Sequence, residues 1–165
     1  MRMNQGVEWA AHCVVLLSML PEGTSLSAAD LAEYHGVPGP YLAKSLQALA
    51  RAGLVASEPG RGGGYRLGRP ADRITLLDVV GAVDEGERFF RCTEIRQRGP
   101  ARAPARAYPP VCAVAGAMWH AEDAWRRELE RTTVADIARQ VAGQAPEVAV
   151  DRSIRWLGTK VRADG

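Results

Sequence analysis

Apolar residues recur at helical spacing along the first half of the chain and predict a series of short helices. The first covers Val7–Met19. A capping box at Ser27–Asp30 opens a second helix, and the turn residues His35–Pro38 end it. A third helix over Pro40–Ala52 places leucines on one stripe and polar residues outside it. Another capping box at Thr75–Asp78 opens a fourth helix.

Two short stretches between the third and fourth helices predict a β-hairpin. Strands at Leu54–Ser57 and Gly64–Leu67 are joined by the glycine-rich tip Pro59–Gly64. A helix-turn-helix followed by such a hairpin is typical of a winged helix, whose second helix enters the major groove of DNA. The alternatives are a flexible surface hairpin with an incidental arginine and a phosphate-binding loop. A phosphate-binding loop precedes a helix, whereas a strand follows here.

The second half of the chain changes character. Residues Arg96–Pro110 are mostly arginine, alanine, proline and glycine, which predicts a mobile loop whose arginines form a solvated charge cluster or contact DNA or acidic partners. A long amphipathic helix after Val111 reaches about Thr132 and suits antiparallel pairing with a second copy, or packing on the first helix. A cap at Thr133–Asp136 opens a short helix, and the tail gives little signal.

These elements predict a mainly α fold with a small β-hairpin wing: a winged helix-turn-helix plus a long C-terminal dimerisation helix. We expect a DNA-binding domain at 1–84, a cofactor-binding loop at 85–111, and a dimerisation helix with a C-terminal segment at 112–165. The 165 residues suffice for one compact domain with a dimerisation segment.

Composition excludes some classes of protein and leaves others open. The chain is 47% hydrophobic and 24% charged, and its net charge of +2 is weak evidence for a nucleic-acid partner. It has no apolar run of the roughly 20 residues that span a bilayer, and no secretory signal, so we expect a cytoplasmic protein. In that reducing compartment, Cys13, Cys92 and Cys112 favour metal or redox roles over a disulfide framework. No catalytic nucleophile-base arrangement is found, so an enzyme is not expected.

The polar face of the third helix supplies most of the predicted DNA contacts. We expect Tyr41, Lys44 and Gln47 in the major groove, Arg51 near the phosphates, Arg61 at the wing, and Ser27 holding a phosphate at a helix N-terminus.

Glu8 and His12 are candidate metal ligands on the first helix. They are four residues apart and therefore project from the same face, with a spacing that suits one metal centre. The alternative is a solvated surface pair. Cys13 points about 100° away around the helix and is predicted to be a small buried residue. His35 and His120 are interpreted as structural.

Taken together, the motifs of the first half resemble those of the winged-helix iron-sulfur regulators that include IscR and NsrR. The similarity covers Gly6–Asp84, and the residues that carry it are Tyr41-Leu42, Ala52-Gly53-Leu54-Val55, Ser57-x-x-Gly60-x-x-Gly63-Gly64-Tyr65-x-Leu67 and Ile74–Val80. The resemblance implies a homodimer that reads a roughly palindromic operator in double-stranded DNA, with half-sites about one DNA turn apart. Wings of the family usually carry an arginine before the first glycine, whereas Pro59 stands here and the cation is Arg61.

The resemblance also implies a cofactor. Better-known members cluster three cysteines after the fourth helix, but here nineteen residues separate Cys92 from Cys112. The start Gly6–Ala10 followed by His12 is most similar to the member RsrR, which holds a [2Fe-2S] cluster. By that similarity, Cys92 and Cys112 of one subunit and Glu8 and His12 of the other hold the cluster, and Trp9 between them is a candidate switch residue.

The sequence therefore predicts a redox-sensing DNA-binding transcriptional regulator, a repressor, whose operator affinity is controlled by a [2Fe-2S] cluster. One alternative is a zinc- or thiol-based winged-helix regulator, because two cysteines, a histidine and a carboxylate can bind zinc. Another is an iron-sulfur electron carrier, against which the predicted wing argues.

Overall fold

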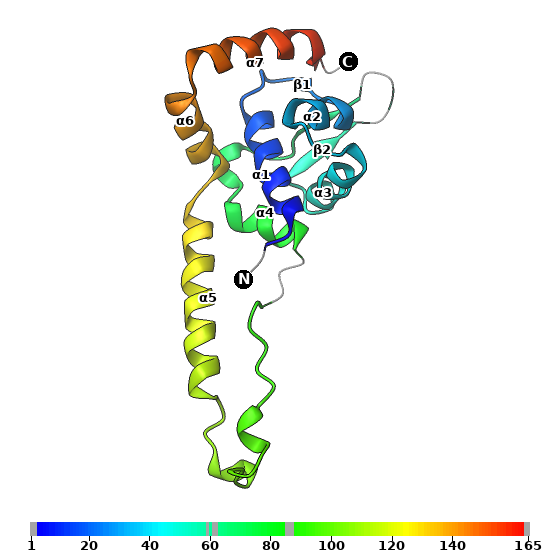
Figure 1. Cartoon of the computed structure of the whole chain (residues 1–165). Helices are drawn as coiled ribbons and strands as arrows, with labels where there is room; N and C mark the ends of the chain where they lie inside the picture. The colour runs from blue at the N-terminus through cyan, green and yellow to red at the C-terminus, as the bar shows by residue number, and fades with distance from the viewer. Residues whose placement is uncertain (1–2, 59, 61–62, 85–87, 164–165) are drawn as a thin grey trace. The chain divides into compact units, whose positions relative to one another are not determined.

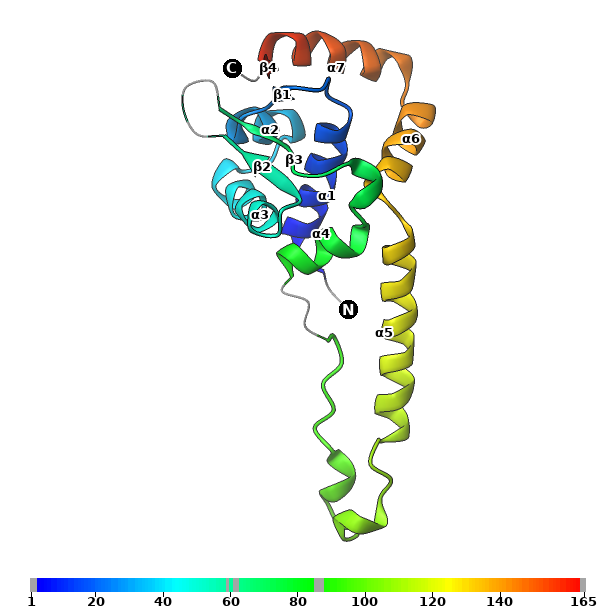
Figure 2. The same cartoon turned by 180° about the vertical axis from the view of Figure 1, so that it is seen from behind.

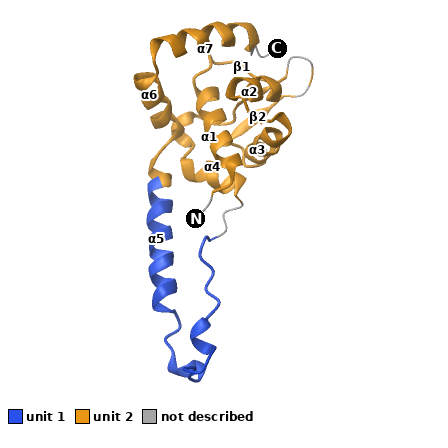
Figure 3. Cartoon of the chain, in the orientation of Figure 1, with its two compact units in different colours: residues 1, 87–128 blue, residues 2–86, 129–165 orange. Residues whose placement is uncertain are grey.

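The structure is a computed structural model that describes residues 3–58, 60, 63–84 and 88–163. The chain divides into two compact units (Figure 3). Unit 1 comprises residues 87–128, and unit 2 comprises residues 2–86 and 129–165. The described residues form seven α-helices and four short strands, which confirms the mainly helical fold with a small hairpin. None of the described helices is long and apolar enough to cross a membrane.

The core of unit 2 lies around the first helix (Figure 1). Helix α1 (Gln5–Ser18) contacts α3 (Gly39–Arg51) and α4 (Leu76–Val83), and α2 (Ala28–His35) packs on α3. The leucines predicted to form the stripe of the third helix are fully buried. The core includes Val14, Leu26, Leu31, Leu42, Leu46, Leu49, Leu54, Ile74 and Val79.

Local capping explains where these helices begin and end. The side chain of Asn4 accepts a hydrogen bond from the Gly6 N–H at 2.9 Å, so α1 begins two residues before the predicted start. Ser27 caps α2, which ends at Gly36 in the left-handed conformation. Thr75 and Asp78 form the predicted capping box of α4. The caps at Ser27 and Thr75 were expected from the sequence, whereas the cap at Asn4 was not.

The predicted wing is an antiparallel hairpin of β2 (Val55–Ser57) and β3 (Tyr65–Leu67), visible from behind in Figure 2. The first residue of β3 joins the hairpin to the body of unit 2 through Leu26. The Tyr65 N–H donates to the Leu26 carbonyl at 2.7 Å, and the Leu26 N–H donates back to the Tyr65 carbonyl at 3.1 Å. Part of the tip, including Pro59 and Arg61, lies outside the described residues.

The C-terminal part of unit 2 is more ordered than the sequence indicated. Helix α6 (Val134–Gln144) contacts α1, and α7 (Glu147–Lys160) follows it. Strand β4 (Arg162–Ala163) pairs antiparallel with β1 (Thr24–Ser25), just before α2. The end of the chain therefore belongs to the same compact unit as the helix-turn-helix.

Helix α7 is connected to α2 by polar contacts. The Tyr34 and Ser153 hydroxyls are 2.8 Å apart, and the Trp156 indole N–H donates to Glu33 at 3.2 Å. Lys160 donates to Glu33 at 2.8 Å. These contacts fasten residues 147–160 onto the first helix of the helix-turn-helix.

Unit 1 consists of the chain from residue 88 and most of α5 (Ala113–Arg131). The loop between them contains two single turns of 3-10 helix, η2 (Ile95–Gln97) and η3 (Ala105–Ala107), where the sequence predicted no regular helix. Glu122 and Arg126, one turn apart on α5, form an ion pair at 3.0 Å. Asp123 of the same helix pairs with Arg88 at 3.2 Å.

Candidate DNA interface and cofactor site

The outer face of α3 presents all four of its predicted DNA contacts to solvent. Tyr41, Lys44, Gln47 and Arg51 are exposed, while the leucine stripe of the same helix is buried. The Lys44 ammonium lies 5.7 Å from the centroid of the Tyr41 ring, so the two side chains occupy neighbouring positions on that face. This arrangement suits contact with bases and phosphates in a groove.

The two remaining predicted DNA contacts have different outcomes. Ser27 is half-buried, and its hydroxyl accepts a hydrogen bond from the Asp30 N–H at 3.1 Å, so it serves as the cap of α2. It stands at the N-terminus of that helix, where an anion would be favoured. Arg61 lies outside the described residues.

A cavity of about 520 Å³ connects the first helix with the predicted DNA-reading helix. Half-buried Trp9 lines this cavity together with Tyr41, Lys44 and Arg51. The two helices approach closely beside it, because a Cβ added at Gly6 would lie 2.8 Å from the Ser45 hydroxyl. Helices α1 and α3 are therefore in close contact at this point.

Glu8 and His12 lie on one face of α1, as their spacing predicted. Both side chains are exposed, and both line a largely apolar cavity of about 380 Å³ in unit 2. The rest of that cavity comes from α1 and the two residues before it, from α4 and from Leu129. The two candidate ligands thus share an open depression whose walls are mostly aliphatic.

His35, which was interpreted as structural, lies against one of these candidate ligands. Its ring centroid is 5.8 Å from that of His12, and its Nε2 atom is buried with no hydrogen-bond partner among the described residues. Burial lowers the pKa of His35, and the nearby His12 charge lowers it further. A neutral ring is therefore favoured at this position.

Cys92 and Cys112 are brought together in unit 1. Both line one cavity of about 600 Å³ and a second one of about 390 Å³, and both are free thiols. Cys112 stands immediately before α5, where the N–H groups of Ala115 and Val114 lower the pKa of its thiol, with Arg96 adding to that effect. The long loop between the two cysteines returns to its starting point.

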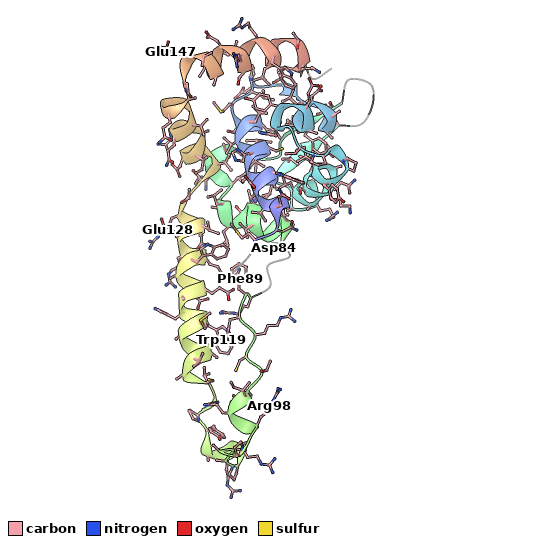
Figure 4. The ribbon with its side chains drawn as sticks, viewed as in Figure 1. Asp84, Phe89, Arg98, Trp119, Glu128 and Glu147 are labelled. Carbon is pink, nitrogen blue, oxygen red and sulfur yellow. The ribbon has the colours of Figure 1, made fainter. Side chains whose placement is uncertain are left out.

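Two residues of α5 hold the chain segment that leads to Cys92, and the sequence analysis did not predict their role. The buried Glu122 carboxylate accepts a hydrogen bond from the Phe89 N–H at 3.2 Å. The Trp119 indole N–H donates to the Phe90 carbonyl at 3.2 Å. Figure 4 labels Phe89 and Trp119 in this part of unit 1. The sequence does show a carboxylate and an indole on the predicted long helix. Their backbone partners are some thirty positions away, so no local pattern links them.

Cys13 is the buried residue that its position on the helix predicted. It has no exposed surface, and burial raises the pKa of its thiol to about 12. A thiol that stays protonated in an aliphatic core is a poor metal ligand.

The described residues contain no group of three or more histidine, cysteine, aspartate or glutamate side chains arranged to hold a metal ion. Unit 2 brings together the pair Glu8 and His12, and unit 1 brings together the pair Cys92 and Cys112. Each unit therefore holds one of the two predicted pairs of candidate ligands.

Sequence comparison identifies the family. A profile of the Rrf2 family, described as iron-dependent transcriptional regulators, matches residues 3–140. The chain belongs to the Rrf2 family. Two proteins from Mycobacterium tuberculosis strains, both named as HTH-type transcriptional regulators, are 34% identical over 148 residues, which cover 89% of this chain and 85% of theirs.

Solved structures of other proteins confirm the fold. CymR, the global cysteine regulator of B. subtilis, superposes with a TM-score of 0.67 at 21% identity, covering 85% of this chain and 98% of that one. IscR of T. potens gives a TM-score of 0.65 at 20% identity, covering 88% and 93%. The relatives are transcriptional regulators and not enzymes, as expected from the sequence. Membership of the Rrf2 family supports transcription regulation through DNA binding.

Proposed function

We propose that this Rrf2 regulator is a homodimer whose operator affinity is set by a [2Fe-2S] cluster held by Glu8, His12, Cys92 and Cys112. The observation that carries the proposal is the presence of two separate ligand pairs, one in each unit, each lining its own cavity. The cysteines of one subunit and the Glu8–His12 pair of the other would then complete each site, as the likeness to RsrR implies.

The donor chemistry fits such a cluster. Thiolates are the usual ligands of iron-sulfur irons, and an imidazole in place of a thiolate raises the reduction potential. Cys92 and Cys112 are free and share a cavity, and the pKa of Cys112 is lowered, which favours the thiolate form that metals bind. Glu8 and His12 are both exposed, as ligation by the cysteines of a second subunit requires. When bound, the cluster would supply a one-electron redox centre whose net charge changes by one.

The residues around α1 offer a route from this site to the DNA. Trp9 stands between the two ligands in sequence and lines the cavity of Tyr41, Lys44 and Arg51. Helices α1 and α3 meet closely at Gly6. A change in the pose of α1 would shift the two reading helices of a dimer relative to each other, so that the half-sites fit or fail. A coupling of about 1–3 kcal/mol between cofactor state and DNA affinity would suffice.

The sharing of ligands between subunits can be tested with mixed dimers. Anaerobically purified His12→Ala and Cys112→Ala homodimers should each lose their iron and labile sulfide. In a dimer of one His12→Ala and one Cys112→Ala chain, sharing leaves one site intact and one doubly damaged. We therefore expect about half the iron of the unmodified dimer.

Matched controls exist for both variants. His120→Ala removes an exposed histidine of α5, and Cys13→Ala removes the buried thiol; both should keep full iron. A mixed dimer without iron would mean that each site takes its ligands from a single chain. Iron retained in the Cys112→Ala homodimer would overturn the ligand assignment.

A thiol-based regulator is the second candidate, because Cys92 and Cys112 line one cavity and the pKa of Cys112 is lowered. Oxidation would then join the two thiols in a disulfide and alter unit 1. Purified protein that is colourless and free of iron, but whose DNA affinity changes on oxidation and recovers with a thiol reductant, would favour this candidate. Visible absorption that bleaches with dithionite favours the cluster. A colourless protein that contains zinc would favour a zinc-stabilised regulator.

The DNA-contact assignment has its own test. Lys44→Ala should weaken binding to all sequences and reduce the salt dependence, because an ammonium contacts phosphates without reading bases. Gln47→Ala should change the preferred operator sequence, because an amide can pair with a base edge. Binding selections from random DNA would contradict the assignment if Lys44→Ala changed the preference and Gln47→Ala did not.

A further inference from the structure

The loop between the two cysteines is closed by one tyrosine. The Tyr108 hydroxyl donates to the Arg96 carbonyl at 2.8 Å and accepts from the Ala103 N–H at 2.9 Å. These bonds connect both ends and the middle of a stretch that the sequence predicted to be mobile. The loop therefore has a defined form in which Cys92 and Cys112 face one cavity.

Arg96 is held in this loop from several sides. Its guanidinium lies 5.0 Å from the centroid of the Tyr108 ring, and one Nη donates to the Pro109 carbonyl at 3.3 Å. Its Nε and Nη groups donate to the two carboxylate oxygens of Glu94, the Nη at 2.8 Å. The side chains of Arg96 and Glu94 are only 22% and 33% exposed. This ion pair is fixed in place more firmly than an ordinary surface pair.

Glu94 occupies an uncommon backbone conformation. With φ of 51°, it is the one residue other than glycine with a positive φ among the described residues. Such a conformation costs of order 1 kcal/mol and persists only where the surroundings enforce it. The strained turn directs the carboxylate to Arg96, and both residues line the cavity of Cys92 and Cys112.

We propose that Arg96 and Glu94 form a charge-setting pair for the two thiols, in which the guanidinium stabilises negative charge on sulfur and the carboxylate limits that effect. The proposal deepens the proposed function, because it assigns the residues that would tune the cofactor. A cation that lines the cavity of the two sulfurs favours their more negative state, and a carboxylate in the same cavity opposes it.

Two neutralising variants should act in opposite directions. In Glu94→Gln, Arg96 keeps its contacts with Tyr108 and Pro109 but loses the neighbouring negative charge. In Arg96→Gln, the Glu94 carboxylate loses its partner. The first variant should raise the reduction potential of the bound cluster and the second should lower it. We expect about threefold in the redox equilibrium in each direction, which is about 28 mV for one electron.

The same pair of variants can be compared without any cofactor. In metal-free protein, iodoacetamide should alkylate Cys92 and Cys112 faster in Glu94→Gln and slower in Arg96→Gln, again by about threefold, because the thiolate is the nucleophile. Arg96→Lys keeps the charge and should stay close to the unmodified protein. Arg106→Gln removes an exposed arginine of the same loop and should change neither rate nor potential.

The outcomes separate this inference from the proposed function. If the protein contains no iron-sulfur cluster, the proposed function fails, and opposite shifts in alkylation still support the pair. If the cluster is present but the two variants shift potential and alkylation in the same direction, the pair only holds the loop, and the inference is overturned. Unchanged values in both variants overturn it as well. If circular dichroism shows that Arg96→Gln does not fold, the inference is tested with the other two variants. Glu94→Gln should then raise the potential and the alkylation rate, and Arg96→Lys should leave both close to those of the unmodified protein.

Discussion

Gly64, immediately before β3, offers the sharpest test of how the hairpin is attached. A Cβ built on this residue would lie 2.8 Å from the carbonyl carbon and oxygen of Leu26, and 2.8 Å from the Ser25 hydroxyl. Two of these atoms are backbone and cannot rotate away. Gly64→Ala must therefore displace the hairpin from residues 25–26 and strain the two hydrogen bonds between Leu26 and Tyr65.

The expected magnitude follows from these contacts. Two backbone hydrogen bonds contribute about 1 kcal/mol each, and forcing one methyl group into a packed site costs about 1–3 kcal/mol. Because the bonds are weakened and not all lost, we expect the free energy of unfolding of Gly64→Ala to fall by about 3 kcal/mol. For a chain of this size that lowers the melting temperature by about 6–12 °C.

Gly81 provides a control with the opposite sign. It is exposed within α4, and a Cβ added there meets no atom within 4 Å. Alanine is the better helix former, so Gly81→Ala should raise the free energy of unfolding by about 0.5–1 kcal/mol. Thermal unfolding followed by far-ultraviolet circular dichroism measures both variants. Gly64→Ala melting at or above the temperature of the unmodified protein would refute the close approach between the wing and residues 25–26.

Three further predictions follow from buried or capping side chains. Because burial raises the pKa of Cys13 to about 12, iodoacetamide at about pH 8 should modify this thiol only after the protein unfolds. The stability that the protonated thiol contributes is present below the pKa of the unfolded chain and is lost in strong alkali. Hydrogen bonds from Thr133 lower the pKa of Asp136, so the carboxylate stabilises the fold above the ordinary aspartate pKa, and this stabilisation is lost in acid. Asp136→Asn should therefore melt at a lower temperature than the unmodified protein at about pH 6, and the difference in melting temperature should shrink by about pH 2.5. Trp156→Phe should lose the hydrogen bond to Glu33, and its free energy of unfolding in urea should fall by about 1 kcal/mol. Trp156→Ala should lose more, because it also removes the ring; equal stability of the two variants would contradict a role for the ring.

The sequence predicted those parts of the fold that depend on local rules. Capping boxes, leucine spacing and a glycine-rich turn act over a few residues, which is why α1 to α4 and the wing were found within one or two positions. Contacts between distant polar groups were not predictable in this way. Helix α7 contacts α2 through Ser153, Trp156 and Lys160, whose partners lie more than a hundred positions away in the sequence and therefore leave no local pattern.

The candidate site shows the same division. Helix geometry sufficed to place Glu8 beside His12, since the four-residue spacing fixes a shared face. The meeting of Cys92 and Cys112 rested on family resemblance alone, because nineteen intervening residues set no distance. What brings them together is a tyrosine hydroxyl bonded to two backbone groups, together with Glu122 and Trp119 on α5. Each of these is a single contact, and no repeating pattern of residues in the sequence announces it.

The pairing of β4 with β1 has a consequence for how the protein is made. During synthesis the residues of the helix-turn-helix leave the ribosome well before Arg162 and Ala163, and N-terminal segments generally fold first. Until α7 arrives, the edge at Thr24–Ser25 and the carboxylate of Glu33 lack the partners they have in the finished protein. A nascent chain that stops short would present a nearly complete reading head with an open strand edge, which proteases and chaperones can recognise. The first helices therefore gain their full set of contacts only after α7 and β4 have been synthesised.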